Sequence, residues 1–459
     1  MTALGLTAAQ IAASVRTNRL TPRQVVREHL ERIAAYDGLV GAFTWIRDVA
    51  AVLAEADAVA ARYDLTRLPL AGVPVAVKDN LPVAGEPMRS GSTATPTGRA
   101  SADHEVVRRV RDAGAVVVGL TRVPELCVFG TTDGATGVAR NPWDTSRTPG
   151  GSSGGSAAAV SAGMVPVALG NDGMGSIRIP AACCGLVGLK PGRGLVPAGL
   201  GALDWYGMSE NGPLTTTVDD AALLLGVLAG DPSLGRVRGP ERPLRVAFST
   251  RSPVAGVRPS RQDVAAVEGV ARLMGDAGHE VVPAGPSYPV TAAAAATCRW
   301  LAGTAADAQG LDPSQLQRRT RVHAALGARL RRLGLPRDRW AASWQARARE
   351  FLSGHDVLLT PALARTPPPA RDWGSQGWLA NMRLNVRYAP YAAPWNLAGL
   401  PAVVVPAGRR SDGLPLAVQM VAGDGGEELL LALAALVEDR LPWPRLAATL
   451  ATPPAPTPI

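Results

Sequence analysis

Short apolar runs recur along the whole chain and alternate with amphipathic helical patterns. The runs at 70–77, 115–119 and 165–169 are long enough for a buried strand and too short for a buried helix. Helical patterns lie between or after them, for example at 105–113 and 262–277. Buried strands that alternate with helices are typical of an α/β protein. We therefore predict an α/β fold whose central mixed β-sheet is flanked by helices on both faces.

The same alternation continues to the end of the chain and argues for a single large domain over residues 1–450. A candidate linker at 231–243 is followed at once by the next strand pattern. The motifs discussed below place the core of the domain at 70–225. Residues 290–390 are the least patterned, and we expect a variable segment on the substrate side there. Residues 451–459 form a Pro-rich tail.

Composition excludes several classes of protein. The net charge is +9, but the arginines are spread out, and their one cluster at 318–332 has the spacing of a solvated helix face with few aromatics to stack bases. We therefore expect no nucleic-acid partner. No run of about 18 apolar residues predicts a membrane span, and residues 1–20 do not resemble a secretory signal.

The four cysteines form no CxxC pair and have no metal-ligand spacing, so no metal site is predicted. Adjacent Cys183 and Cys184 are expected to be small buried packing residues. This cysteine usage fits a reducing compartment, and we expect a cytoplasmic protein.

Two serines lie in separate glycine-rich turns, and they are the strongest chemical signal in the sequence. Ser152 lies in Pro-Gly-Gly-Ser-Ser-Gly-Gly-Ser at 149–156, and Ser176 lies in Asp-Gly-Met-Gly-Ser at 172–176. Glycine allows backbone N–H groups to approach a bound atom closely. Each serine is therefore a candidate nucleophile with an oxyanion hole beside it.

The base that would activate such a serine is less obvious. Ser153 formally matches G-x-S-x-G, but the preceding stretch 141–149 is rich in turn formers, and none of the five histidines lies in a loop of catalytic character. A Ser-His-Asp hydrolase is therefore disfavoured. The alternative base is Lys78, which follows the strand pattern at 70–77 and is one of only two lysines, the other being Lys190. A neutral lysine can take a proton from serine, although Lys78 taken alone fits an ordinary ion pair with Asp79 equally well.

Several motifs in order resemble the amidase signature family. The residues that carry the resemblance are Val-Pro-Val-Ala-Val-Lys-Asp-Asn at 73–80, the turn at 149–156 and the segment at 172–180. Further similar segments extend the resemblance over roughly residues 5–440; they are 130–143, 212–223, 396–402 and 413–419. The resemblance implies a single-domain amidase fold and an amidohydrolase with no metal or other cofactor.

The resemblance also implies a role for each site residue. Ser176 would be the nucleophile, Ser152 the bridging serine after a cis peptide, and Lys78 the general base. The family separates its serines by 24 residues, and 176 minus 152 gives 24 here. Two further sets follow from the motif: the oxyanion-hole N–H groups of Gly173, Met174, Gly175 and Ser176, and the supporting residues Ser153, Asp172 and Arg178. Lys190 would be structural.

The chain departs from the family pattern at Met174, where a glycine is usual. A methionine there would be strained if φ were positive, or its side chain would lie across the acyl pocket. Substrate choice, activity or loop shape would then change, and a catalytically impaired, binding-only member is one alternative. The other alternative is an amide-forming or acyl-transferring enzyme that uses the same acyl-enzyme.

The substrate is expected to be a small-molecule amide or ester, and a homodimer is left open. Ile179 stands where the glutaminase subunit of the tRNA-dependent amidotransferase has glutamine, so that member is disfavoured. An aryl, acyl or specialised-metabolite amide is favoured instead. Candidate substrate-binding residues are Thr132, Asp133 and Trp205, with Trp373 and Trp378 as weaker candidates.

Overall fold

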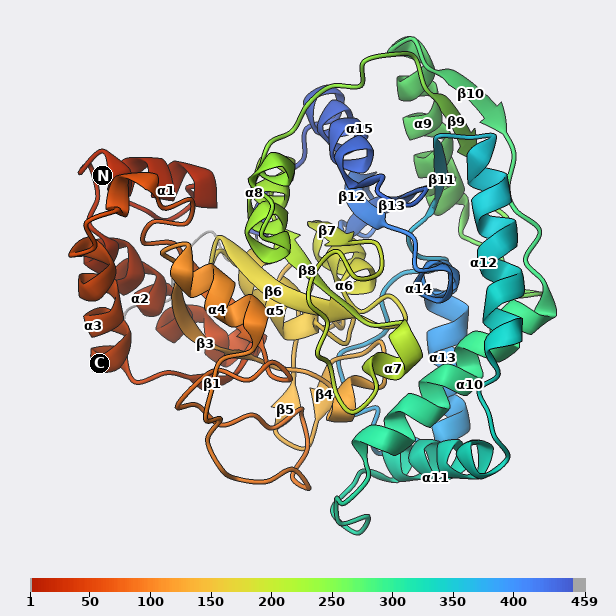
Figure 1. The fold of residues 1–459 in the computed structure, drawn as a ribbon, viewed down its shortest axis with the longest axis horizontal. Helices are drawn as coiled ribbons and strands as arrows, with labels where there is room; N and C mark the ends of the chain where they lie inside the picture. Colours follow the sequence, from red (N-terminus) through yellow and green to blue (C-terminus); the bar gives the residue numbers. More distant parts are fainter. Residues whose placement is uncertain (1, 449–459) are drawn as a thin grey trace.

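One 11-stranded mixed sheet runs through the protein. The structure is a computed structural model that describes residues 2–448, so the tail predicted at 451–459 lies outside the described residues. The strand order is β1-β3-β2-β6-β8-β7-β12-β13-β11-β9-β10 (Figure 1). Strands β3, β2 and β6 are parallel to one another, as are β10, β9 and β11, and antiparallel strands join the two groups. The predicted mixed sheet is confirmed.

The sheet strands are β1 Phe43–Ile46, β2 Pro74–Lys78, β3 Val116–Thr121, β6 Val167–Asp172, β7 Val187–Lys190, β8 Glu210–Thr215, β9 Arg245–Phe248, β10 Glu280–Pro283, β11 Val357–Pro361, β12 Ala402–Arg409 and β13 Pro415–Ala422. A separate small hairpin consists of β4 Asp133–Gly134 and β5 Gly137–Val138.

Helices cover the sheet in two layers, as predicted. Helices α4, α8 and α15 contact one another in a row, and α5 contacts α6 in a second layer (Figure 1). The helices are α1 Ala8–Arg16, α2 Pro22–Val40, α3 Val49–Ala60, α4 Glu105–Asp112, α5 Gly154–Ser161, α6 Arg178–Cys184, α7 Asp204–Gly207, α8 Val218–Ala229, α9 Arg261–Asp276, α10 Val290–Asp307, α11 Arg318–Arg332, α12 Asp338–Ser353, α13 Trp378–Tyr388, α14 Ala393–Ala398 and α15 Glu427–Arg440.

Local sequence signals explain several element boundaries. Thr7 forms a reciprocal capping box with Gln10 at the start of α1. Thr21 accepts a hydrogen bond from the Gln24 N–H at the start of α2, whose first residue is a proline. Helix α2 ends at Gly41, whose φ of 64° is the left-handed conformation that glycine adopts most readily.

The segment at 290–390 contains the whole of four helices, α10 to α13, although its sequence is weakly patterned. These helices lie together at the end of the molecule opposite the N-terminal helices (Figure 1). A second hydrophobic core forms beneath them and includes Phe129, Trp300, Trp344 and Trp395. Long-range aromatic packing therefore stabilises this region, and a scan for local periodicity does not detect such packing.

The arginine cluster at 318–332 only partly matches the prediction of a solvated face. Arg318, Arg321 and Arg329 are exposed on α11, but Arg319 is fully buried and pairs with Asp133 at 2.8 Å. The prediction was wrong for Arg319, because a single inward position on a helix cannot be told from its outward neighbours by charge alone. Separately, none of the described helices is both long and apolar enough to cross a membrane.

Candidate active site

The parallel strands β3, β2 and β6 bring the chemical groups to one edge of the sheet. Strand β2 ends at Lys78 and the neighbouring strand β6 ends at Asp172. The carboxyl ends of parallel strands meet at the same edge, where ligands of open α/β sheets usually bind. The turns that carry Ser152 and Ser176 lie at this edge; we call residues 149–156 the Ser152 turn and residues 172–178 the Ser176 turn.

Lys78 is fully buried and directs its amine at the Ser152 hydroxyl. The Nζ atom lies 2.8 Å from Ser152 Oγ, 3.1 Å from the Asn171 carbonyl oxygen and 2.7 Å from Asn171 Oδ1. Burial lowers the pKa of Lys78 to about 8, although nearby Cys127 and Asp172 act in the opposite direction. An appreciable fraction of the amine is therefore neutral near pH 7, as a general base requires.

Asn171 orients the Lys78 amine and is a residue that sequence reasoning missed. A neutral amine has two N–H donors and one lone pair. When the two donors bind the two Asn171 oxygens, the lone pair points at Ser152 Oγ. The Asn171 side chain is fixed in turn, because its Nδ2 donates to Asn80 Oδ1 at 2.7 Å. Asn80 ends the motif at 73–80, and Asn171 directly precedes the motif at 172–180, which is the only sequence signal that pointed to it.

The Ser152 turn packs tightly against the backbone at 129–131. The peptide bond between Gly151 and Ser152 is cis, as the family resemblance implied. A Cβ at Gly151 would lie 2.9 Å from the Gly130 carbonyl carbon and 2.9 Å from the Thr131 nitrogen, so no other residue fits without moving the backbone. The Thr132 hydroxyl donates to the Gly150 carbonyl at 2.8 Å and fixes the turn from outside.

Asp172 organises the Ser176 turn. Its carboxylate accepts from the N–H groups of Gly175 and Ile177 at 2.6 and 3.2 Å, and from Arg178 Nε and Nη2 at 2.9 and 3.1 Å. Burial opposes ionisation of Asp172, but the Arg178 charge and these hydrogen bonds, with one from Asn396, hold its pKa below the usual range. The carboxylate is therefore charged at any pH at which the protein works.

Asp172 also reduces the number of N–H groups that are available to the predicted oxyanion hole. The Gly175 N–H is bound to the Asp172 carboxylate, so we leave Gly175 out of the donor set. Within residues 2–448 the N–H groups of Gly173, Met174 and Ser176 carry no hydrogen bond and remain available. A glycine is required at Gly175, where φ is 117° and a Cβ would lie 2.5 Å from the Ala392 Cβ. Met174 has no positive φ, so the methionine adds no backbone strain.

Ser153 joins the two turns. Its N–H donates to the Ser176 carbonyl at 3.1 Å, and its hydroxyl donates to the Asn171 carbonyl at 3.2 Å. Ser153 occupies the N-cap position of α5, which begins at Gly154, but its side chain makes no capping hydrogen bond. Its contacts therefore link Ser176 and Asn171, and they fit the predicted supporting role better than helix capping.

Two cavities meet at Ser176. The first has a volume of about 350 Å³ and is called the polar cavity; it is lined by residues that include Asn80, Cys127, Ser152, Asn171, Ser176 and Asp307. The second has a volume of about 140 Å³ and is called the apolar cavity; its lining includes Phe129, Met174, Ser176, Tyr288, Trp300 and Met382. The hydroxyls of Ser152 and Ser176 share the polar cavity, and no direct hydrogen bond joins them in the described structure.

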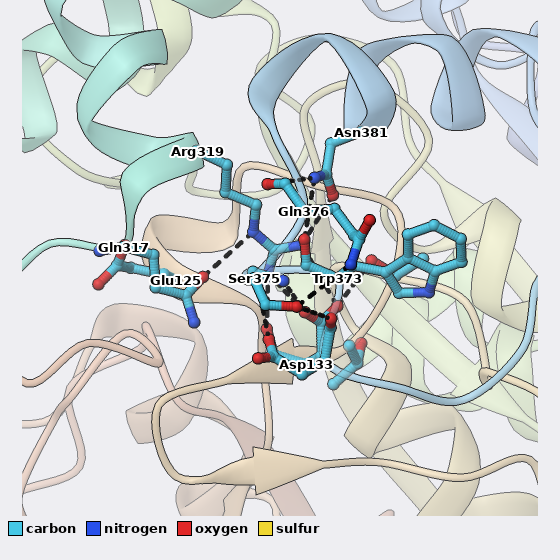
Figure 2. Close-up of polar contacts among 12 residues, drawn as sticks. Glu125, Asp133, Gln317, Arg319, Trp373, Ser375, Gln376 and Asn381 are labelled. Carbon is cyan, nitrogen blue, oxygen red and sulfur yellow. Dashed lines mark hydrogen bonds and ion pairs between the residues drawn. The ribbon is translucent and has the colours of Figure 1, made fainter.

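Of the predicted substrate-binding residues, only Trp205 lines a cavity beside Ser176. Thr132 and Asp133 are fully buried and belong to neither cavity wall. Figure 2 shows Asp133 inside a polar network, where its carboxylate accepts from Arg319, the Thr131 hydroxyl and the Gly374 N–H. The structure therefore places both residues away from the walls of the two cavities beside Ser176.

The tryptophans Trp373 and Trp378 are likewise outside both cavities. The Trp373 carbonyl accepts from Asn381 Nδ2 in the network of Figure 2, and Trp378 Nε1 donates to His323 Nδ1. Neither cavity wall includes a histidine, which agrees with the rejection of a Ser-His-Asp site. Cys183 and Cys184 are buried as expected.

Lys190 lies on β7 away from both cavities. Its ammonium is fully buried and donates to the Pro191 carbonyl at 2.5 Å, with Glu210 nearby. Burial lowers the pKa of Lys190 as well. Its contacts fit the structural role expected of it. Among residues 2–448, no group of three or more His, Cys, Asp or Glu side chains is placed to hold a metal ion.

Comparison with known proteins identifies the chain's relatives. The family model described as Amidase matches residues 24–431. A putative amidase, AmiB2, from Mycobacterium tuberculosis is 42% identical over 453 residues, covering 95% of this chain and 96% of the relative. An acylamidase from Rhodococcus erythropolis is 32% identical and covers 95% of this chain and 96% of its own length.

Solved structures agree with the sequence comparison. The 6-aminohexanoate cyclic dimer hydrolase superposes with a TM-score of 0.87 at 27% identity, covering 97% of this chain and 99% of that one. A bacterial aryl acylamidase of the amidase signature family has a TM-score of 0.81 at 26% identity, covering 98% of this chain and 99% of that one.

Proposed function

Because the chain belongs to the amidase signature family, we propose that it hydrolyses a carboxylic amide through an acyl-enzyme on Ser176. Amide hydrolysis is the activity that the family and the structural relatives support. The observation that carries the finer proposal is the contact between the buried Lys78 Nζ and Ser152 Oγ at 2.8 Å, beside the cavity that both serines share.

In the first half-reaction, Ser152 passes a proton from Ser176 to Lys78. Neutral Lys78 accepts the Ser152 proton as Ser152 accepts the Ser176 proton, and Ser176 Oγ forms a bond to the amide carbonyl carbon. The carbonyl oxygen becomes negative and is stabilised by the free N–H groups of the Ser176 turn. Lys78 then returns the proton through Ser152 to the amide nitrogen, the C–N bond breaks, and the amine leaves.

In the second half-reaction, water takes the place of the amine. The same relay removes a proton from water as its oxygen attacks the acyl carbon, and the ester bond to Ser176 breaks. The proton returns to Ser176 Oγ, so a carboxylic acid leaves and the enzyme is restored. The two serine hydroxyls share one cavity without a direct hydrogen bond, and catalytic hydrogen bonds commonly tighten only when substrate is bound.

Asn171 acts in this scheme as a positioning residue. It holds the two N–H groups of neutral Lys78 so that the lone pair points at Ser152. Asp172 and Arg178 keep the Ser176 turn in shape, and Ser153 holds the two turns in register. The proposed oxyanion hole therefore has three N–H donors, those of Gly173, Met174 and Ser176, in place of the four expected from the sequence.

The test is mass-spectrometric detection of an acyl-enzyme during turnover of a panel of simple amides and esters. We expect the acyl mass on the peptide that contains Ser176, and a fluorophosphonate probe should label the same residue. Ser176→Ala should lose labelling and turnover, by roughly 10⁴–10⁶-fold. Undiminished labelling of that variant would refute the assignment.

Two other outcomes would support the alternatives raised by the sequence. If added amines or hydroxylamine intercept the acyl-enzyme faster than water does, acyl transfer is the main reaction. If the purified protein binds amides but never acylates, it is a binding-only member. Met174 lends this last alternative little support, because the methionine strains no backbone and the N–H groups of Gly173, Met174 and Ser176 carry no hydrogen bond within the described residues.

A further inference from the structure

The two cavities beside Ser176 differ in chemistry, and this difference assigns the two halves of the substrate. The inference rests on the proposed function, because it needs Ser176 as nucleophile and Ser152 as proton bridge. Ser152 lines the polar cavity and does not line the apolar one. The proton that releases the amine comes from Ser152 Oγ, so the leaving nitrogen must lie within hydrogen-bond reach of that atom. The amine half of the substrate therefore occupies the polar cavity, and the acyl half occupies the apolar cavity.

The apolar cavity limits the acyl group to a compact, uncharged one. No charged side chain lines it, and aromatic and aliphatic groups from α10, α13 and the Ser176 turn form its walls. Its volume of about 140 Å³ is close to the ~150 Å³ of an apolar cavity known to bind benzene. A benzoyl group or a short branched alkanoyl group fits this space, and a charged carboxylate would lose its solvation there without gaining a partner.

Met174 sets the size limit of the apolar cavity. Its side chain lines this cavity and not the polar one, and it comes from the same turn as Ser176. An acyl group attached to Ser176 Oγ therefore extends directly past Met174. The unusual residue of the turn is thus a specificity residue for the acyl group.

The polar cavity carries a single carboxylate, Asp307, at the end of α10. One of its oxygens accepts from Trp205 Nε1 at 2.8 Å and the other from the Ala202 N–H at 2.8 Å. Each oxygen has a second lone pair. No lysine or arginine forms an ion pair with Asp307 in the described structure, and no basic side chain lines this cavity. Burial raises the pKa of Asp307, as expected of a carboxylate that lacks a cation beside it.

We propose that the preferred substrates are amides of a compact apolar acid with an amine that carries a second, cationic group, and that Asp307 binds this cation. The Asp307 carboxylate, which has no cationic partner among the described residues of the protein itself, would form an ion pair with the cationic group of the substrate. Charge-assisted hydrogen bonds of this kind favour the cationic amine by about 10–100-fold over a neutral amine of the same size.

Two isomeric amides test the orientation. N-(2-aminoethyl)benzamide carries the phenyl group on the acyl side and the ammonium on the amine side, and 3-aminopropanoyl anilide has them reversed. We expect kcat/KM for the benzamide to exceed that for the anilide by at least about tenfold, although aniline is the better leaving group. A preference for the anilide would overturn the assignment of the two cavities.

A second comparison tests Asp307. N-propylbenzamide is the neutral counterpart of N-(2-aminoethyl)benzamide, and we expect the cationic amide to be preferred by about tenfold or more. Asp307→Asn should abolish that preference, whereas Asp312→Asn, which removes an exposed carboxylate nearby, should keep it. Equal kcat/KM values for the two amides in the unaltered enzyme would overturn the proposal without any variant.

The size limit is tested with 1-naphthoyl amides of the same diamine. The unaltered enzyme should process them at least about tenfold more slowly than the benzoyl amide, and Met174→Ala should narrow that gap. A gap that is unchanged in Met174→Ala would overturn the role of Met174. These failures differ from a failure of the proposed function, because Ser176 would still form an acyl-enzyme in each case. Absence of any acyl-enzyme on Ser176 would reject both.

Discussion

The two serine turns stand side by side but are stabilised in different ways. The Ser176 turn is held mainly by its own neighbours in sequence, since Asp172 accepts from groups at most six residues away, from Gly175 to Arg178, and Asn396 adds one donor from a distant segment. The Ser152 turn is held by distant groups. Lys78 is 74 residues away, and the Thr132 hydroxyl that binds Gly150 comes from a loop that Asp133 ties to Arg319, 186 residues further on.

This contrast teaches which parts of the site depend on the whole fold. A turn closed mainly by near neighbours orders few additional residues when it forms. A turn closed by distant groups exists only when the sheet, the hairpin β4–β5 and α11 are all in place. The shape of the Ser176 turn is therefore set mostly by its local sequence, whereas the Ser152 turn depends more on tertiary structure.

The largest expected effect is the loss of the base. Lys78→Arg should lower kcat/KM about as much as Lys78→Ala, by roughly 10⁴-fold, because arginine stays protonated and cannot accept a proton at neutral pH. Steady-state kinetics at pH 7 to 9 measure this loss. The Lys190→Arg variant is the matched control, and substantial activity in Lys78→Arg would contradict the general-base role.

Next in size is a variant of the Ser176 turn. Asp172→Asn should lower kcat by about 10²–10³-fold, because the N–H groups around Ser176 lose the carboxylate that directs them. It should also lower stability by about 3–5 kcal/mol, since Arg178 is left buried without its charge partner. The surface variant Asp144→Asn should change neither quantity measurably. A fully active Asp172→Asn enzyme would show that the Ser176 turn holds its shape without the ion pair.

A moderate effect is expected on the pH profile. In the proposed mechanism the neutral form of Lys78 is the base, so kcat/KM of the unaltered enzyme should rise with pH through about 8. Asn171→Asp adds a negative charge beside Nζ and should raise the pKa of Lys78 by about 1–3 units. The rising limb then moves to higher pH and activity at pH 7 falls about tenfold or more. If activity fell while the rising limb of the pH profile stayed at the same pH, Asn171 would have only a structural role.

The Asp133–Arg319 ion pair supports the Ser152 turn from a distance, and its loss should affect stability more than rate. Asp133→Asn leaves Arg319 buried without an ion-pair partner and should cost about 3–5 kcal/mol. The rate should fall only about tenfold, because Asp133 reaches Ser152 through Thr132 and Gly150. Thermal unfolding together with kcat measures both. The double variant Asp133→Leu with Arg319→Met should recover most of the stability. If Asp133→Asn lowered the rate as much as Asp172→Asn, the two turns would not differ in the way described above.

The smallest effect is expected from Thr132→Val. This variant keeps the shape of the side chain and removes only its hydrogen bond to the Gly150 carbonyl, so it should cost about 1 kcal/mol and reduce kcat a few-fold. Thr145→Val, at an exposed threonine, is the matched control. An unchanged kcat would mean that the Ser152 turn needs no external hydrogen bond.

The same contrast explains which features the sequence predicted. Strands such as β3 and β6 are continuous apolar runs, so their existence could be predicted from local residues. Strand β8 reads Glu-Asn-Gly-Pro-Leu-Thr over 210–215, and its strand-breaking residues are overruled by pairing with β6 and β7. Helix α11 was indicated by the spacing of its arginines, but α10, α12 and α13 were missed because their packing depends on the second aromatic core, which is visible only in three dimensions.

In the site, motifs located Lys78, Ser152 and Ser176, because the chemistry fixes those residue types in recognisable turns. Asn171 and Arg319 could not be predicted, because each is defined by a partner more than 90 residues away. Thr132 and Asp133 were predicted to meet the substrate, but they are buried and line neither cavity beside Ser176. Proximity to the motif in sequence identified the right loop, and only the fold shows which side of the loop faces the cavity.

The scarcity of lysine has a practical consequence. Lys78 and Lys190 are the only two lysines in the chain, and both are fully buried at the ends of sheet strands. A lysine-specific protease or an amine-acylating reagent thus finds no lysine side chain to attack while the sheet is closed. Modification at Lys78 can occur only when β2 detaches, so its rate reports the population of molecules in which the central sheet has opened. The protein thereby contains its own probe of unfolding, placed at its proposed general base.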